Sequence, residues 1–179
     1  MRLFRQIILS IVISCIICMQ AVATPSNIAA YLEEPKLVGE ARLKYMFWNV
    51  FDASLYSSTG SYDPTKPFAL SLRYLRSLDG QKIVEKSMEE IQQQKHSASP
   101  EQLSRWEKAL LAIIPDVTEG TTITGVRTEQ GFTSFYFDND SIGIIEDEDF
   151  TRAFFGIWLG ENVSEPDVRA GLLGSNQGK

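Results

Sequence analysis

The chain has 179 residues, with 17 lysines and arginines against 23 aspartates and glutamates, and its formal net charge is −6. A net acidic chain without a long basic run argues against nucleic-acid binding, which needs a surface that neutralises phosphates. The same charge disfavours attachment to an anionic membrane surface, and the length suits a single domain once a targeting segment is removed.

The first 23 residues have the pattern of a secretory signal peptide. Two arginines precede an apolar run, Ile7–Cys18, and small residues then form an A-x-A cleavage site that ends at Ala23. The run is shorter than the ~20 apolar residues that a membrane-spanning helix needs. We therefore expect cleavage after Ala23 and an exported, periplasmic mature chain without a transmembrane span. Lipidation at Cys15 and an uncleaved anchor are the alternatives.

The mature chain is expected to fold without disulfides, because both cysteines of the sequence lie in the targeting segment. Cleavage also removes two of the 17 basic residues, which leaves 15 against 23 acidic ones and changes the formal charge from −6 to −8. We interpret residues 24–37 as a lead-in, residues 38–174 as one domain large enough to bury a core, and residues 175–179 as a tail.

The first part of the domain has the patterns of β-strands. The aromatic and apolar stretch at residues 38–56 predicts one long strand or a bent strand pair, and a turn-rich loop follows at residues 57–67. Residues 68–76 alternate with the period of a half-buried strand. The side of this strand that we expect to face the core holds Phe68, Leu70, Leu72 and Tyr74.

Two helices are predicted next. The first begins after Gly80, and its apolar positions recur at helical spacing. The second has a capping box at Ser99 and Gln102, with Pro100 at the first helical position, and Pro115 ends it. The core-facing positions of the first helix are Val84, Met88 and Ile91.

Strands are predicted again at residues 121–128, 131–137 and 141–145, separated by short turns. A fourth region, residues 147–174, holds two more helices. Strands joined as hairpins form an antiparallel sheet, and four amphipathic helices are enough to cover one of its faces. The fold class is therefore α+β, with an antiparallel sheet covered on one face by helices.

The third predicted helix concentrates aromatic residues on one stripe. Phe150, Phe154 and Trp158 recur four residues apart, and three acidic residues open the helix, where they favour its dipole. We expect this stripe to pack on the sheet rather than to bind a ligand. We also expect Gly160 to end the helix in the left-handed conformation, and Gly174 to end the last helix.

The order of these elements resembles the chalcone isomerase-like family, in particular its bacterial exported branch. The resemblance rests on VGEARLKYMFWNVFDASLY, on PFALSLRYLRSLDGQKIVEKSMEEI, and on GFTSFYFDNDSIGIIEDEDFTRAFFGIWLG with SEPDVRAGLLG. It implies an open-faced β-sandwich with a hydrophobic cleft between sheet and helices. Plant enzymes of the family cyclise a chalcone to a flavanone, and non-catalytic relatives bind fatty acids.

The catalytic pattern of the plant enzymes is not matched. Alignment of the family's blocks places Met46 at the catalytic threonine, Ile83 at the tyrosine and Glu90 at the asparagine. A methionine and an isoleucine donate no hydrogen bond to a developing enolate or phenolate. We therefore expect no plant-type isomerase activity and assign no catalytic residue.

Four residues are candidates for ligand binding. Arg73 alternates with Ala69 and Ser71, so it has room on its side of the strand to receive a carboxylate, although an exposed sheet face explains it equally well. Arg42 and Tyr45 stand near the positions that the fatty-acid-binding relatives use for a carboxylate, offset by several residues. Trp48 completes the set.

Metal and cofactor sites are not expected. His96 is the sole histidine, and we interpret it as a solvated residue between two helices. The acidic run Glu146–Asp149 suits a helix N-terminus better than a calcium cage, because adjacent residues cannot surround an ion.

Three functions remain open. The first is an exported, non-catalytic protein that binds a small apolar or fatty-acid-like ligand between sheet and helices. The second is an isomerase or lyase with a site unlike that of the plant enzymes. The third is an interaction module that docks another envelope protein through its exposed sheet face.

Overall fold

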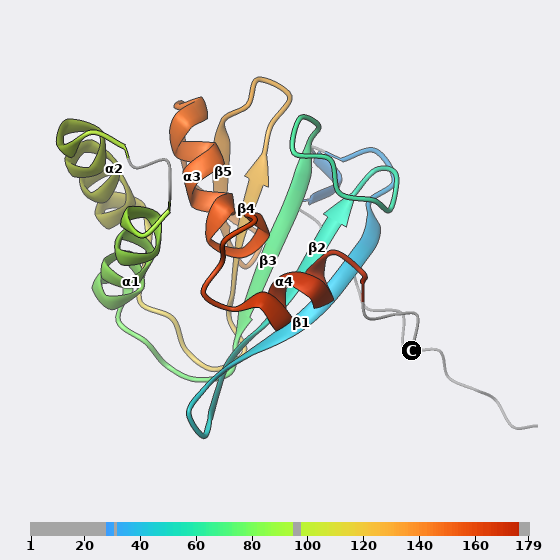
Figure 1. Ribbon diagram of the computed structural model, residues 1–179, viewed down its shortest axis with the longest axis horizontal. Coiled ribbons are helices and arrows are strands. Elements are labelled where there is room, and N and C mark those ends of the chain that lie inside the picture. The colour runs from blue at the N-terminus through green and yellow to red at the C-terminus, as the bar shows by residue number, and fades with distance from the viewer. Residues whose placement is uncertain (1–27, 31, 95–97, 176–179) are drawn as a thin grey trace, which may run out of the picture.

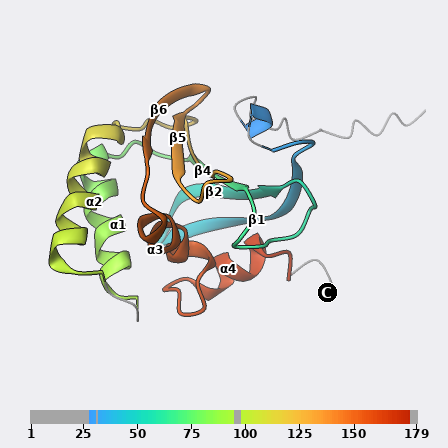
Figure 2. The ribbon, with the colours of Figure 1, turned by 90° about the horizontal axis from the view of Figure 1, so that it is seen from above.

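A computed structural model describes residues 28–30, 32–94 and 98–175, which form an α+β fold. Six antiparallel strands lie in the order β1-β2-β3-β4-β5-β6, so each strand pairs with its neighbours in sequence. Figures 1 and 2 show four helices on one face of this sheet, as predicted. The strands are β1 (Lys36–Tyr45), β2 (Trp48–Ser57), β3 (Phe68–Tyr74), β4 (Thr122–Arg127), β5 (Thr133–Phe137) and β6 (Asp140–Ile145). The helices are α1 (Gly80–Gln92), α2 (Pro100–Ile113), α3 (Glu148–Leu159) and α4 (Pro166–Leu172).

The predicted core-facing side of β3 is confirmed, but the strand is not half-buried as predicted, because Arg73 alone among its seven residues is exposed. The side that carries Phe68 and Leu70 faces the helices, and both side chains are buried in the main core. Arg73, on the other side of the strand, is exposed. Strand period alone therefore identified which face the helices cover.

Residues 38–56 form a hairpin of two antiparallel strands, which is the strand-pair alternative of the prediction. The turn is Met46–Phe47, and Tyr45 pairs with Trp48 across it. Neither glycine nor asparagine marks this turn, so the sequence lacked the usual hairpin signal. Met46 adopts a left-handed backbone with φ of 54°.

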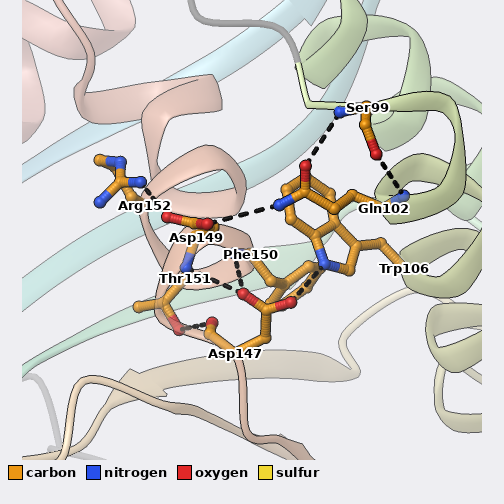
Figure 3. Close-up of polar contacts among 8 residues, drawn as sticks. All are labelled: Ser99, Gln102, Trp106, Asp147, Asp149, Phe150, Thr151 and Arg152. Atoms are coloured by element: carbon orange, nitrogen blue, oxygen red, sulfur yellow. Dashed lines mark hydrogen bonds and ion pairs between the residues drawn. The ribbon is translucent and has the colours of Figure 1, made fainter.

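The predicted cap of α2 is confirmed. The Ser99 hydroxyl accepts from the Gln102 amide, and the Gln102 side chain accepts from the Ser99 amide, which closes the capping box. Asp147 caps α3 by accepting from the amides of Asp149 and Phe150 (Figure 3). The prediction for Gly160 was wrong: its φ is −65°, and the helix ends in an extended residue. Gly174, which was predicted to end the last helix, follows the end of α4 at Leu172 and is left-handed with φ of 71°.

The other face of the sheet, which we call the open face, carries none of the four α-helices (Figure 2). Near the end of β2, Ile28 and Leu32 cover Tyr56 and Val126, so part of the predicted lead-in packs on this face. The short 3-10 helix η1 (Ile28–Ala30) lies there, opposite the four helices (Figure 2).

Helix α4 lies directly against β1. A Cβ on Gly39 would stand 2.2 Å from the Gly171 carbonyl oxygen, and a Cβ on Gly171 would stand 2.6 Å from that of Glu40. Glycine at both positions lets the two backbones touch. This close backbone contact fixes the position of α4 against β1, and with it the positions of the side chains on α4.

In the described part of the chain, no helix combines the length and the apolar character that crossing a bilayer requires. The predicted signal peptide, residues 1–23, lies outside the described residues.

Candidate functional site

The space between the sheet and the helices is filled by aromatic side chains. Phe155 meets Phe68 edge to face, with ring centroids 4.6 Å apart, and Phe154 meets Phe135 at 5.1 Å. Each of these rings is less than a tenth exposed. Phe154, which belongs to the aromatic stripe of α3, therefore packs on the sheet as predicted, and Phe155 beside it makes a further contact with the sheet.

A cavity of about 590 Å³ lies instead at the end of the sheet where β2 leads into β3 and β4 into β5. It is bounded by the loop before β3, by the β4–β5 turn, by the outer side of α3 and by α4. Its volume falls within the range of roughly 300–1,000 Å³ that is typical of small-molecule sites. Its lining residues are Tyr62, Pro64, Thr65, Phe68, Arg127, Gly131, Glu148, Thr151, Arg152, Phe155, Gly156, Leu159, Gly160, Glu161 and Arg169.

Two half-buried arginines, Arg127 and Arg169, line this cavity. Arg169 donates through Nε to the Leu159 carbonyl at 3.2 Å, and Arg127 donates through an η nitrogen to the Thr128 carbonyl at 3.0 Å. Within the described residues neither guanidinium takes part in an ion pair. Their positions are thus fixed by backbone oxygens while their charge stays available to an anion.

Tyr62 lies beside both arginines. Burial raises the pKa of its hydroxyl, and the charges of Arg169 and Arg127 partly oppose that rise. The ring packs edge to face on Phe68, with centroids 5.3 Å apart. A neutral phenol at the mouth of an apolar cavity donates a hydrogen bond to an anion in the same place as the arginines.

The floor and the rim of the cavity differ in character. Phe68, Phe155 and Leu159 form an apolar floor and are each under 5% exposed. Glu148 and Arg152 stand at the exposed rim. A molecule with a small anionic head and an apolar body fits this distribution of groups.

A second cavity, of about 660 Å³, lies on the other side of α3, against α1 and α2. It is lined more by amides and carboxylates, among them Gln94, Gln102 and Asp149. The residues that it shares with the first cavity are Arg152, Gly156, Gly160 and Glu161. No pair of half-buried arginines lines it. The first cavity is therefore the stronger candidate.

The four predicted ligand-binding residues line neither cavity. Arg42 forms a two-point ion pair with Asp52, at 2.5 and 2.9 Å, and Arg73 is exposed on the open face in register with Asp52. Tyr45 and Trp48 are exposed at the tip of the β1–β2 hairpin. The structure places all four on the β1–β3 half of the sheet without enclosing a space, and their role in binding stays a prediction.

The positions aligned with the plant catalytic residues are not gathered in a cavity either. Met46 is exposed at the hairpin tip, whereas Ile83 and Glu90 belong to α1. Glu90 accepts from Ser164 and pairs with Lys86 at 2.9 Å. None of the three lines either cavity.

Sequence reasoning missed the residues that line the first cavity. Tyr62 lies in a loop that was interpreted only as turn-rich, Arg127 is the last residue of a strand, and Arg169 belongs to a short terminal helix. Each has an unremarkable local context, and only the fold brings them together.

The acidic run lies at the start of α3, as predicted, with Glu148 and Asp149 in its first turn. Asp147 accepts from the amides of Asp149 and Phe150 and from the indole of Trp106. Among the residues that the structure describes, no group of three or more potential metal ligands occurs, and the expectation that the chain holds no metal stays a prediction. His96 lies outside the described residues.

The sequence profile of the family described as chalcone isomerase-like matches residues 19–174. The chain belongs to the chalcone isomerase-like family. A search of curated proteins finds no match. Among solved structures, the chain is similar to a fatty-acid binding protein of Arabidopsis thaliana, with a TM-score of 0.63, 10% identity, and 80% of this chain and 88% of that one covered. At this identity the likeness shows the fold, so the predicted family and fold are both confirmed.

Proposed function

We propose that this chalcone isomerase-like protein binds a small amphipathic carboxylate, of the fatty-acid type, in the cavity between the β2–β3 loop, α3 and α4. The observation that carries the proposal is the meeting of Arg127, Arg169 and Tyr62 above an apolar floor. The carboxylate accepts from the guanidinium groups and from the phenol, and the chain of the ligand packs along α3. The fatty-acid binding protein that shares the fold supports the same ligand class.

The proposal makes the protein a binder rather than a catalyst. The cavity is lined by neither histidine nor cysteine, and the positions aligned with the plant catalytic residues lie elsewhere. Tyr62 is held neutral by burial, which suits a hydrogen-bond donor better than a general base.

The test compares dodecanoate with dodecanol, two ligands of equal chain length that differ in charge. Isothermal titration should give a carboxylate affinity at least about tenfold higher, because hydrogen bonds to a charged group are worth ~1.5–3 kcal/mol. Native mass spectrometry of protein purified from its own host should show a bound acid. Equal affinities for the two ligands, or rapid turnover of a chalcone, would contradict the proposal.

We also propose that the protein acts after export. The supporting pattern is the basic start, the apolar run Ile7–Cys18 and the small residues that end at Ala23. Intact-mass measurement of the protein from its host tests this, because it separates cleavage after Ala23 from lipidation at Cys15 and from an uncleaved chain. Either of the last two results overturns cleavage after Ala23.

A further inference from the structure

The β1–β2 hairpin ends in four consecutive large side chains that are exposed. Tyr45 is 67% exposed, Met46 76%, Phe47 95% and Trp48 61%. Figure 1 shows this turn projecting past the ends of the other strands, away from the helices. Single exposed apolar residues are common, but four in a row at a projecting tip form a patch that calls for a partner.

The tip also departs from what hairpin geometry favours. Met46 holds a left-handed φ of 54°, a conformation that glycine or asparagine adopts at lower cost. Hairpin turns of two residues favour those same residue types. Apolar side chains at this turn therefore work against the stability of the hairpin, and such departures from local rules mark functional positions.

Positive charge surrounds the tip. Lys44 precedes it, and the Arg76 guanidinium lies 5.0 Å from the centre of the Trp48 ring. In the described part of the chain neither cation forms an ion pair. Asp52, further along β2, is paired with Arg42 and so adds little negative charge. The tip is thus basic on a protein whose overall charge is negative.

We propose that this hairpin tip binds the surface of an anionic lipid bilayer. Phe47 and Met46 enter the border of the acyl chains, while the amphipathic rings of Tyr45 and Trp48 lie at headgroup level. Lys44 and Arg76 meet the lipid phosphates. The acidic remainder of the protein stays away from the bilayer, so only the tip makes contact. The net negative charge disfavours adsorption of a whole face of the protein to anionic lipid, but binding through the tip does not require such adsorption.

A lipid surface suits the tip better than a protein groove. The tip projects from the sheet, with apolar side chains at its end, amphipathic rings next to them and cationic side chains behind the rings. This order matches a membrane interface, in which the acyl chains are followed by the headgroups and their phosphates. Strand β2 separates it from the cavity: Trp48 is at the tip, and Ser57 is in register with Phe68 of the cavity floor. At ~3.3 Å per residue this is roughly 30 Å. Lipid binding at the tip is therefore independent of ligand binding in the cavity.

The test uses the full chain with vesicles of phosphatidylethanolamine and phosphatidylglycerol whose acyl chains are brominated. Bromine quenches a tryptophan that reaches the acyl border. Trp48 is exposed at the tip, whereas Trp106 is 3% exposed and Trp158 is half-buried on α3. We expect quenching in the wild type, its loss in Trp48→Phe, and a reduction of about tenfold or more in vesicle affinity in Phe47→Asp. The matched control, Leu111→Asp on α2, changes another exposed apolar residue and should leave quenching unchanged.

A second variant separates binding from folding. Met46→Gly should raise the melting temperature, because it relieves the left-handed strain, and should lower vesicle affinity. The apolar run Ile7–Cys18 could itself bind vesicles, but it is present in every variant and therefore does not explain a difference between them. Binding through this run also does not bring Trp48 into contact with the brominated acyl chains. The proposal is overturned if Trp48 is not quenched, or if Phe47→Asp converts a dimer to a monomer without any lipid effect.

Discussion

Trp106 of α2 donates its indole N–H to the Asp147 carboxylate across 2.8 Å and so ties α2 to the first turn of α3 (Figure 3). Burial disfavours the charge of Asp147, but the hydrogen bonds from Trp106 and from the Phe150 and Asp149 amides outweigh it. Together they hold the pKa of this carboxyl below its ordinary value. Asp147 is therefore both a helix cap and a link between two helices.

Replacing Asp147 should make the protein less stable in a pH-dependent way. Asp147→Ala removes the cap and leaves the Trp106 indole without its acceptor, and we expect a loss of about 1–3 kcal/mol in the free energy of unfolding at pH 7. A carboxyl with a lowered folded-state pKa contributes stability that is complete above the unfolded-state pKa of about 3.9 and is lost as the pH falls through the folded-state value. The difference in the free energy of unfolding between the wild type and Asp147→Ala should therefore become smaller as the pH is lowered from 5 to about 2.

Urea unfolding across that pH range measures the effect. Glu119→Gln, which removes one carboxylate from an exposed loop, serves as the control and should change little. A difference between Asp147→Ala and the wild type that stays constant down to pH 2 would show that the charge of Asp147 does not matter.

The hydroxyls of Thr133 and Thr151 meet at 2.8 Å and join β5 to α3 inside the core. Both residues are nearly inaccessible, at 0% and 4% exposed. Thr151→Val should cost about 1–3 kcal/mol, because it leaves the Thr133 hydroxyl buried without this partner. The double variant Thr133→Val, Thr151→Val should cost no more than Thr151→Val alone. A double-mutant cycle by chemical unfolding measures the coupling, and strictly additive effects would contradict it.

Close backbone contact between Gly39 and Gly171 should make Gly39→Ala destabilising. The new methyl group has no room, and we expect a loss of about 1–3 kcal/mol from overpacking as α4 moves away from β1. Because Arg169 lies on α4, the same change should weaken carboxylate binding. Gly120→Ala is the control: its φ of 92° strains the backbone, but no atom lies within 4 Å of the added carbon. Calorimetric melting and ligand titration of both variants give the comparison, and equal effects in the two variants would contradict it.

The sequence predicted the fold well where a local pattern determines structure. The core-facing side of β3, the capping box at Ser99 and the aromatic stripe of α3 each depend on neighbours within a few residues, and each is confirmed. The turn at Met46 was ambiguous because its residues lack the usual turn chemistry. Gly160 was assigned the wrong conformation because a glycine after a helix permits a left-handed end without requiring it.

The cavity could not be predicted in the same way. Tyr62, Arg127 and Arg169 are separated by 65 and 42 residues along the chain, and they meet only because β4 lies beside β3 and α4 lies on β1. Arg73 was a candidate because it alternates with small residues, and Arg42 because it stands near the position that the fatty-acid-binding relatives use for a carboxylate. In the structure they belong to the open face, where Arg42 is already paired with Asp52.

The most direct test of the proposed function compares two double variants in one titration with dodecanoate. Arg127→Gln with Arg169→Gln removes the charge from the cavity, and Arg42→Gln with Arg73→Gln removes the same charge from the open face. Since a charged hydrogen bond is worth ~1.5–3 kcal/mol, we predict that the first pair weakens binding by at least about tenfold and that the second leaves it within about twofold of the wild type. Weakened binding in the second pair with unchanged binding in the first would contradict the account.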